Sequence, residues 1–258
     1  MREALIVSTA RTPIGKAYRG TFNNTNAPRM AGWAIEEAVK RSGIDPEKID
    51  DVIMGCAIQQ GTTHGNIARN SALSAGLPVT VSGMTIDRQC SSGMMAIATA
   101  AKQIIVDRMD VVVGGGLESI SLVQNEKMNI DRYLDKNLIS KHKHIYMPML
   151  QTAEVVGKKY GISREDQDLY SYYSQMRTAK AQETGKFDKE IFPVNTTMGV
   201  YNKETKEISL VEKMLSKDEG NRTSTNIDGL SSLKPVVEGG LITAGNASQL
   251  SDGASACV

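Results

Sequence analysis

The chain has 258 residues, of which 40% are hydrophobic and 23% are charged, so a globular protein with a sizeable core is expected rather than a disordered chain. Its formal net charge of +1 gives no electrostatic reason to expect nucleic acid or an anionic membrane as a partner. Three widely spaced cysteines, Cys56, Cys90 and Cys257, predict neither a disulfide framework nor a zinc site, and they favour a reducing compartment. Because the sequence has no long apolar run and no signal-peptide layout, we expect a soluble cytoplasmic protein.

The first part of the chain alternates strand-like and helix-like patterns. The β-rich residues 4–9 predict a strand, and the apolar spacing over 30–42 predicts a helix that ends at Gly43. Residues 51–58 form a continuous apolar run, which predicts a buried strand with Cys56 in the core. Short uninterrupted runs between helices indicate strands that are covered on both faces, and therefore an α/β fold with a largely parallel sheet.

The stretch around Cys90 connects a strand with a helix. Residues 79–81 are rich in β-branched side chains, and the apolar spacing over 94–106 predicts a buried helix. Cys90 is therefore expected at a sharp strand-to-helix turn, where the unpaired N–H groups and partial positive charge of the helix start favour a thiolate. From these residues alone two interpretations stay open, because Cys90 could be a nucleophile or a small buried hydrophobe.

The second half of the chain is more polar. Residues 111–113 predict another buried strand, and the glycines at 114–116 after it are expected to allow close backbone packing, since they lack the other residues of a phosphate-binding motif. His142 and His144 lie in a polar segment without a cluster of carboxylates or cysteines, so we predict a solvated loop and no metal site. Further elements are predicted as helices over 152–160 and 164–184 and as a strand over 208–211.

Several short motifs occur together in an order that resembles the thiolases. They are Ala10-Arg11-Thr12-Pro13-Ile14-Gly15, Asp87-Arg88-Gln89-Cys90-Ser91-Ser92-Gly93, Gly115-Gly116-Leu117-Glu118-Ser119, Gln151-Thr152-Ala153-Glu154, Asp218-Glu219-Gly220-Asn221-Arg222, Leu233-Lys234-Pro235, and Asn246-Ala247-Ser248 with Asp252-Gly253-Ala254. Without these companions, Arg11 would be taken for a solvated turn residue.

The resemblance covers nearly the whole chain and implies a thiolase-like core half. That core is a mixed, largely parallel sheet covered by helices, and an α+β loop domain is inserted in it. We expect the N-terminal core domain over 1–119, the inserted CoA-binding loop domain over 120–240, and a return to the core over 241–258.

The resemblance also implies a function in fatty acid metabolism. In thiolases the cysteine of this motif takes up an acyl group from an acyl-CoA, so Cys90 is expected to be the catalytic nucleophile. The activity implied is that of an acetyl-CoA C-acyltransferase or C-acetyltransferase, which thiolyses 3-oxoacyl-CoA with CoA or runs the reverse Claisen condensation. CoA and acyl-CoA are then substrates, and no permanently bound cofactor or metal is implied.

Three further residues match positions that contact CoA in the family. Arg222 matches an arginine at the nucleotide end of CoA, Ser248 matches a serine near the pantetheine arm, and Met149 matches a methionine that lines the acyl pocket. Taken singly, they would be interpreted as a surface arginine, a turn serine and a core methionine.

The chain departs from the family pattern in two respects. Pro148-Met149-Leu150 stands where thiolases that make acetoacetyl-CoA often carry His-Met-Gly, which is more similar to the degradative branch. Thiolases also use a histidine that activates the cysteine and a second cysteine that moves a proton, within Gly-His-Pro and Cys-x-Gly-x-Gly motifs that are missing here. We therefore expect a truncated chain without the C-terminal half, inactive alone, from a protein that forms a homodimer or homotetramer.

Other functions stay open. One is a related condensing enzyme, similar to the ketoacyl synthases, which would depend on a carrier protein rather than on CoA. Another is a non-catalytic CoA-binding or lipid-binding module in which Cys90 belongs to the core. A third is a role in assembly, because a truncated core would expose apolar surface.

Overall fold

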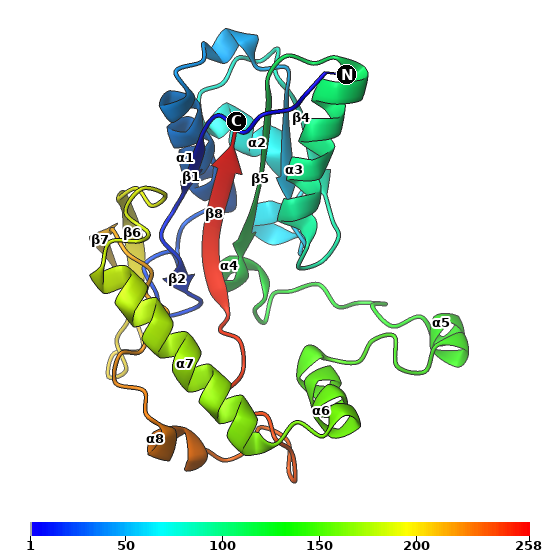
Figure 1. The fold of residues 1–258 in the computed structure, drawn as a ribbon, viewed down its shortest axis with the longest axis vertical. Coiled ribbons are helices and arrows are strands. Elements are labelled where there is room, and N and C mark those ends of the chain that lie inside the picture. Colours follow the sequence, from blue (N-terminus) through cyan, green and yellow to red (C-terminus); the bar gives the residue numbers. More distant parts are fainter. Residues whose placement is uncertain (1) are drawn as a thin grey trace. The chain divides into compact units, whose positions relative to one another are not determined.

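The structure, a computed structural model, describes residues 2–258 (Figure 1). The chain forms two compact units, which are described separately. The first, called the sheet unit, contains residues 2–128, 187–220 and 250–258. The second, called the helical unit, contains residues 129–186 and 221–249.

The sheet unit is built on a six-stranded mixed sheet with the order β1-β8-β5-β3-β4, and β2 also pairs with β8. β3 runs parallel to β4 and to β5, whereas β8 runs antiparallel to β5, β1 and β2. The predicted α/β class and mixed sheet are confirmed, with the parallel pairings at β3. The strands are β1 (Thr9–Arg11), β2 (Gly15–Lys16), β3 (Asp51–Gly55), β4 (Ser82–Ile86), β5 (Val112–Ser119) and β8 (Ser251–Cys257).

Helices cover both faces of this sheet. α1 (Ala27–Ser42) and α2 (Ile67–Ser74) share the larger core cluster with Met54, whereas α3 (Ser92–Lys102) packs against Ile53 on the opposite face. Neighbouring residues of β3 belong to different clusters because side chains alternate along a strand. The sheet unit also contains the short helices η1 (Pro46–Lys48), η2 (Gly61–Thr63) and α4 (Ile120–Val123) and a π-helical turn, η3 (Gln103–Asp107).

The limits of α1 follow from its sequence. Pro28 lies in the first turn, where its missing N–H costs nothing, and the backbone of Gly43 takes the left-handed conformation (φ 68°) that ends the helix. The helix buries Met30, Ala34 and Ile35 completely. The predicted glycine cap is thus confirmed, and the helix begins three residues before the expected start.

A hairpin completes the sheet unit. β6 (Val194–Tyr201) pairs with β7 (Ile208–Leu215) over eight residues. Asn23 binds both backbone groups of Gly199, since its Nδ2 donates to the carbonyl oxygen (2.8 Å) and its Oδ1 accepts from the amide (2.9 Å). The hydroxyls of Thr25 and Thr196 are 2.7 Å apart. These contacts explain why the hairpin belongs to the sheet unit.

The helical unit consists of helices and connecting segments. Its helices are α5 (Lys136–Lys141), α6 (Met149–Tyr160), α7 (Arg164–Glu183) and α8 (Ile227–Ser231). Ser163 caps α7, because its hydroxyl accepts from the amide of Asp166 at 3.0 Å. Leu169 and Tyr173 on α7 are 43% and 49% exposed, so these apolar side chains are only partly covered.

The units differ in extent from the expected domains. The sheet unit reaches Met128 and also contains residues 187–220. The strand predicted over 208–211 is part of β7, and it lies with its partner β6 in the sheet unit and not in the other unit. The helical unit runs on to Gln249, beyond the boundary expected at 240. The pattern of the sequence could not place the hairpin, because its side-chain contacts with residues 23–25 span more than 170 positions.

Three local predictions need correction. Residues 79–81 form a turn, and the strand begins only at Ser82. Residues 4–8 lie outside the ladder of β1, and Leu5 and Ile6 are 71% and 64% exposed. The helix after Cys90 is buried on one side only, since Met94 is 75% exposed. No helix within residues 2–258 is both long enough and apolar enough to span a membrane.

Candidate active site

Cys90 lies in the tight turn between β4 and α3, as predicted. β4 ends at Ile86 and α3 begins at Ser92, so five residues reverse the direction of the chain. Gln89 has a positive φ of 49°, which is uncommon for a residue other than glycine and indicates a sharply bent backbone. Cys90 is exposed, whereas Cys56 and Cys257 are buried. The alternative that Cys90 is a core residue is therefore wrong.

Short-range hydrogen bonds hold this turn. The amide of Arg88 donates to the hydroxyl of Ser92 (2.8 Å), and that hydroxyl donates to the carbonyl oxygen of Gln89 (2.6 Å). The amide of Gln89 donates to Oδ1 of Asp87 at 2.7 Å. The side chains of the motif thus replace the backbone bonds that the bend removes, and they fix the backbone on both sides of Cys90.

Glycines allow the sheet to approach the start of α3. A β-carbon added to Gly55 at the end of β3 would overlap the backbone of Ser92 and Gly93. One added to Gly116 on β5 would lie 3.1 Å from the carbonyl oxygen of Gly55 and 3.2 Å from the α-carbon of Gly93. The predicted close packing of the glycine run is confirmed, and it places α3, with Cys90 just before it, directly against the sheet.

Cys56, directly after β3, and the partly buried Glu118, near the end of β5, interact electrostatically. Cys56 is fully buried, as predicted, and its Sγ lies 3.7 Å from the carbonyl oxygen of Ile58. Burial and the nearby Glu118 carboxylate raise the pKa of the Cys56 thiol to about 12. Burial also raises the pKa of Glu118, and the charge of Asp87 adds to this effect, although the amide of Ala57 donates to Glu118.

Glu118 was not among the functional residues predicted from the sequence, although it lies in one of the short motifs. A signal was available in the sequence, because Glu118 follows a run of apolar and glycine residues, and a carboxylate in a buried strand is costly unless it has a partner. Glu118 Oε2 is buried without a hydrogen-bond partner among the described residues, as is the hydroxyl of Ser119.

The three residues matched to CoA contacts all belong to the helical unit. Arg222 and Ser248 are exposed, and Met149 is the first residue of α6 and 71% exposed. The interpretation of Met149 as a core residue is therefore wrong. The backbone at Arg222 is fixed, because its amide donates to Oε1 of Gln175 on α7 at 2.8 Å.

A hollow of about 290 Å³ lies in the segment that leads to α6. Lys143 and His144 give it a polar side, and Tyr146, Met147 and Pro148 give it an apolar one. Its remaining lining residues are Leu134, Ile139 and Gln151. Across residues 2–258, no group of three or more His, Cys, Asp and Glu side chains is placed to hold a metal ion.

Two motifs that lie about two hundred residues apart in sequence meet in the sheet unit. The guanidinium of Arg11 contacts both carboxylate oxygens of Asp218, at 2.7 and 3.0 Å, and Oε1 of Glu190 at 2.8 Å. Asp218 also accepts from the amide of Ile14 at 2.8 Å. Arg11 is consequently a paired residue of β1 rather than a solvated turn residue, and its motif serves to tie the N-terminal loop to the end of the hairpin.

Similarity to known proteins agrees with this arrangement. The family model described as "Thiolase, N-terminal domain" matches residues 4–258. The chain is 42% identical to a 3-ketoacyl-CoA thiolase of Bacillus subtilis and 37% identical to a β-ketoadipyl-CoA thiolase of Acinetobacter baylyi, and each match covers 99% of this chain. The crystal structure of the Bacillus anthracis acetyl-CoA acetyltransferase superposes with a TM-score of 0.82, at 35% identity and over 100% of this chain.

The chain spans 65% of the length of each of these three relatives. The match to the family model extends over the Cys90 turn, the glycine run and both units. None of these similarities supports the alternative of an enzyme similar to the ketoacyl synthases. On the family model and on the identity to its relatives, the chain belongs to the thiolase family.

Proposed function

We propose that the chain carries the acyl-accepting nucleophile of a thiolase, and that this nucleophile is Cys90. The observation that supports the proposal is an exposed thiol in a turn that is fixed by the motif's own side chains and leads into α3, an 11-residue helix. The field at the start of such a helix stabilises negative charge, which the sulfur carries when it attacks a carbonyl group.

The reaction proposed for the whole protein is thiolysis of a 3-oxoacyl-CoA. The sulfur of Cys90 bonds to the C3 carbonyl carbon, the C2–C3 bond breaks, and its electron pair leaves with C2 of acetyl-CoA, which takes up a proton. The sulfur of a second CoA then bonds to the acyl carbon, the bond to Cys90 breaks, and the proton of the CoA thiol is released to the enzyme. The reverse sequence is a Claisen condensation.

By resemblance, the proton transfers belong to the histidine and second-cysteine motifs that this sequence lacks. This chain alone is therefore expected to be acylated slowly and to turn over little.

The helical unit is proposed to bind CoA. Arg222 would contact the nucleotide end, Ser248 the pantetheine arm, and Met149 the acyl group. Their exposure leaves all three side chains accessible to a ligand. CoA is a substrate in this scheme, and no permanently bound cofactor is proposed.

We also propose that the whole protein is a cytoplasmic homodimer or homotetramer. In support, the sheet unit exposes large apolar side chains, among them Met94 on α3 (75%), Val106 on η3 (71%) and Val79 before β4 (79%). A second copy of the chain would cover such a surface.

Alkylation kinetics test the proposed nucleophile. Iodoacetamide at near-neutral pH should modify Cys90 faster than a free thiol in solution, and CoA should slow this reaction. Cys56 and Cys257 are matched internal controls, because both are buried and should remain unmodified until the protein unfolds. Modification of Cys90 at the rate of a free thiol, with no protection by CoA, would count against the proposal.

A further inference from the structure

The segment Leu241–Ser248 of the helical unit is irregular, yet side chains from two helices fix its backbone. Glu154 on α6 is only 7% exposed. Its carboxylate accepts from the amide of Leu241 (2.9 Å to either oxygen) and from the amide of Ile242 (2.8 Å). One buried carboxylate therefore holds the beginning of the segment.

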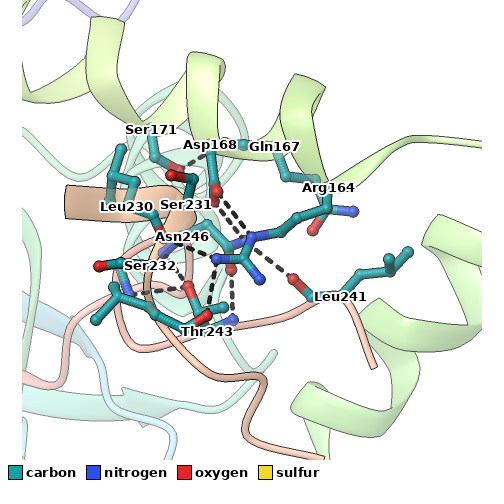
Figure 2. A network of polar contacts seen from close by, with 12 residues as sticks. Arg164, Gln167, Asp168, Ser171, Leu230, Ser231, Ser232, Leu241, Thr243 and Asn246 are labelled. Atoms are coloured by element: carbon teal, nitrogen blue, oxygen red, sulfur yellow. Dashed lines mark hydrogen bonds and ion pairs between the residues drawn. The ribbon is translucent and has the colours of Figure 1, made fainter. Parts of the chain in front are cut away.

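A second buried carboxylate holds its middle (Figure 2). Asp168 on α7 is 3% exposed, and its Oδ1 accepts from Nδ2 of Asn246 at 3.1 Å. Its Oδ2 accepts from Nε of Arg164 at 2.7 Å, and the same guanidinium donates to the carbonyl oxygen of Leu230 at 2.7 Å. The buried charge of Asp168 is thus paired, and the pair is anchored on α8.

Within the segment, Asn246 and Thr243 close a compact turn. Oδ1 of Asn246 accepts from the amide of Thr243 (2.8 Å), and its Nδ2 also donates to the carbonyl oxygen of Leu241 (3.1 Å). The hydroxyl of Thr243 accepts from the amides of Gly245 (3.2 Å) and Asn246 (3.3 Å), and the carbonyl oxygen of Thr243 accepts from the amide of Ala247 (3.0 Å). The backbone is therefore shaped up to the residue before Ser248.

We infer that Asp168 and Asn246 are positioning residues, which hold the segment in one conformation so that Ser248 is presented to the pantetheine arm of CoA. This inference rests on the proposed function of the helical unit. A segment that is ordered before binding loses less conformational entropy when the ligand arrives, so the same contact gives a tighter complex. Asp168 and Asn246 act through the backbone and do not themselves touch the ligand.

Calorimetric titration of the full 258-residue chain with two probes tests the inference. CoA carries both the nucleotide and the pantetheine arm, whereas adenosine 3′,5′-bisphosphate carries the nucleotide alone. Asn246→Ala should raise the Kd for CoA about tenfold, which corresponds to ~1.4 kcal/mol. It should leave the Kd for adenosine 3′,5′-bisphosphate unchanged, because Arg222 is fixed separately by Gln175.

Two substitutions, made singly and together, separate a positioning role of these side chains from a general effect on folding. Asn246→Asp places a second carboxylate against Asp168 and should weaken CoA binding as Asn246→Ala does. Adding Asp168→Asn restores one charge and one amide in the contact, and it should recover part of the affinity. Glu165→Gln is the control, since it removes a negative charge from an exposed position of α7 and should change neither Kd.

Variants of Ser248 and Asn246 separate the presence of a CoA site in the helical unit from the positioning role of Asp168 and Asn246. If the unaltered chain does not bind CoA, or if Ser248→Ala leaves its Kd unchanged, the CoA site proposed in the helical unit is wrong. If Ser248→Ala weakens CoA binding but Asn246→Ala does not, only the positioning role is overturned. Equal losses for both probes, or no recovery in the double variant, would also overturn it, because they indicate general damage to the unit.

Discussion

Among single residues, the partly buried carboxylate of Glu118 gives a testable dependence of stability on pH. Burial raises the pKa of Glu118 above its ordinary value of 4.5, so the folded protein holds this proton more tightly than the unfolded chain. As the pH rises above 4.5, the unfolded chain ionises first, and this carboxylate progressively costs stability. Glu118→Gln removes that cost and can still accept the hydrogen bond from the amide of Ala57.

We therefore expect Glu118→Gln to gain stability relative to the unaltered protein as the pH rises from about 4.5 towards neutrality. The measurement is the difference in free energy of unfolding from denaturant titrations at a series of pH values. The different side chains of Glu and Gln also shift the free energy of unfolding by an amount that does not depend on pH. The informative quantity is therefore the change of the difference in free energy with pH. If the stability gained by Glu118→Gln is independent of pH, or grows as the pH falls, the pKa of Glu118 is not raised in the folded protein.

The sequence predicted the turn that carries Cys90, but it did not predict the buried carboxylates of Glu154 and Asp168. The type and order of residues 87–93 were enough to place Cys90 in a turn, because the contacts that form it join residues at most four positions apart. The roles of Asp168 and Glu154 were not predictable in this way. Their partners in the segment Leu241–Ser248 lie 78 to 88 positions away, and an isolated carboxylate on a helix normally faces solvent.

At the scale of elements, the start of α3 depends on its approach to β3. Gly55→Ala adds a methyl group that overlaps the backbone at Ser92, so α3 must shift or the strand must bend. Overpacking of this kind costs roughly 1–3 kcal/mol, and here it should also slow the alkylation of Cys90. Thermal or denaturant unfolding, together with iodoacetamide kinetics, measures both effects.

Gly93→Ala is the matched control for this substitution. Its added β-carbon would lie 3.9 Å from the carbonyl oxygen of Gly115, an ordinary contact, and alanine favours a helix over glycine by up to about 1 kcal/mol. We expect this variant to be at least as stable as the unaltered protein. If Gly55→Ala is equally well tolerated, the close packing of β3 against α3 does not determine the turn.

Elements with strong local signals were predicted well, and their ends less so. The caps of α1 and α7 are local, because the amide of Gly43 donates to the carbonyl oxygen of Lys40 and the hydroxyl of Ser163 accepts from the amide of Asp166. Contacts of three residues' span are within reach of a sequence pattern. β-Branched residues 79–81 suggested a strand, but Pro78 accepts from the amide of Val81 and turns the chain there. The ladder that begins at Ser82 depends instead on Asp51, more than 30 positions away.

At the scale of the whole molecule, the two units differ in their cores. The larger hydrophobic cluster lies in the sheet unit and contains α1, α2, β3 and β5 residues. The helical unit buries few apolar side chains among the described residues, chiefly Leu230 and Ile242, together with the polar Glu154, Asp168 and Thr243. Its order rests more on hydrogen bonds than on apolar burial.

Amide hydrogen exchange should show this difference. Regions with few buried apolar contacts open with lower free energies, so the amides of α7 should exchange faster than those of β3 and β5. Mass spectrometry of peptides from each unit, after exchange under native conditions, gives the measurement. Equal protection of α7 and β5 would mean that the helical unit does not open independently of the sheet unit.

The role of Cys90 as the nucleophile is tested most directly by locating the acyl group that acetyl-CoA leaves on the protein. The 258-residue chain is incubated with acetyl-CoA, digested at low pH to preserve thioesters, and its cysteine peptides are mapped by mass spectrometry. We expect an acetyl adduct on the peptide that contains Cys90, none on those with Cys56 or Cys257, and none anywhere in Cys90→Ser. An acetyl group on another residue, or an adduct that persists in Cys90→Ser, would contradict the assignment of Cys90 as the nucleophile.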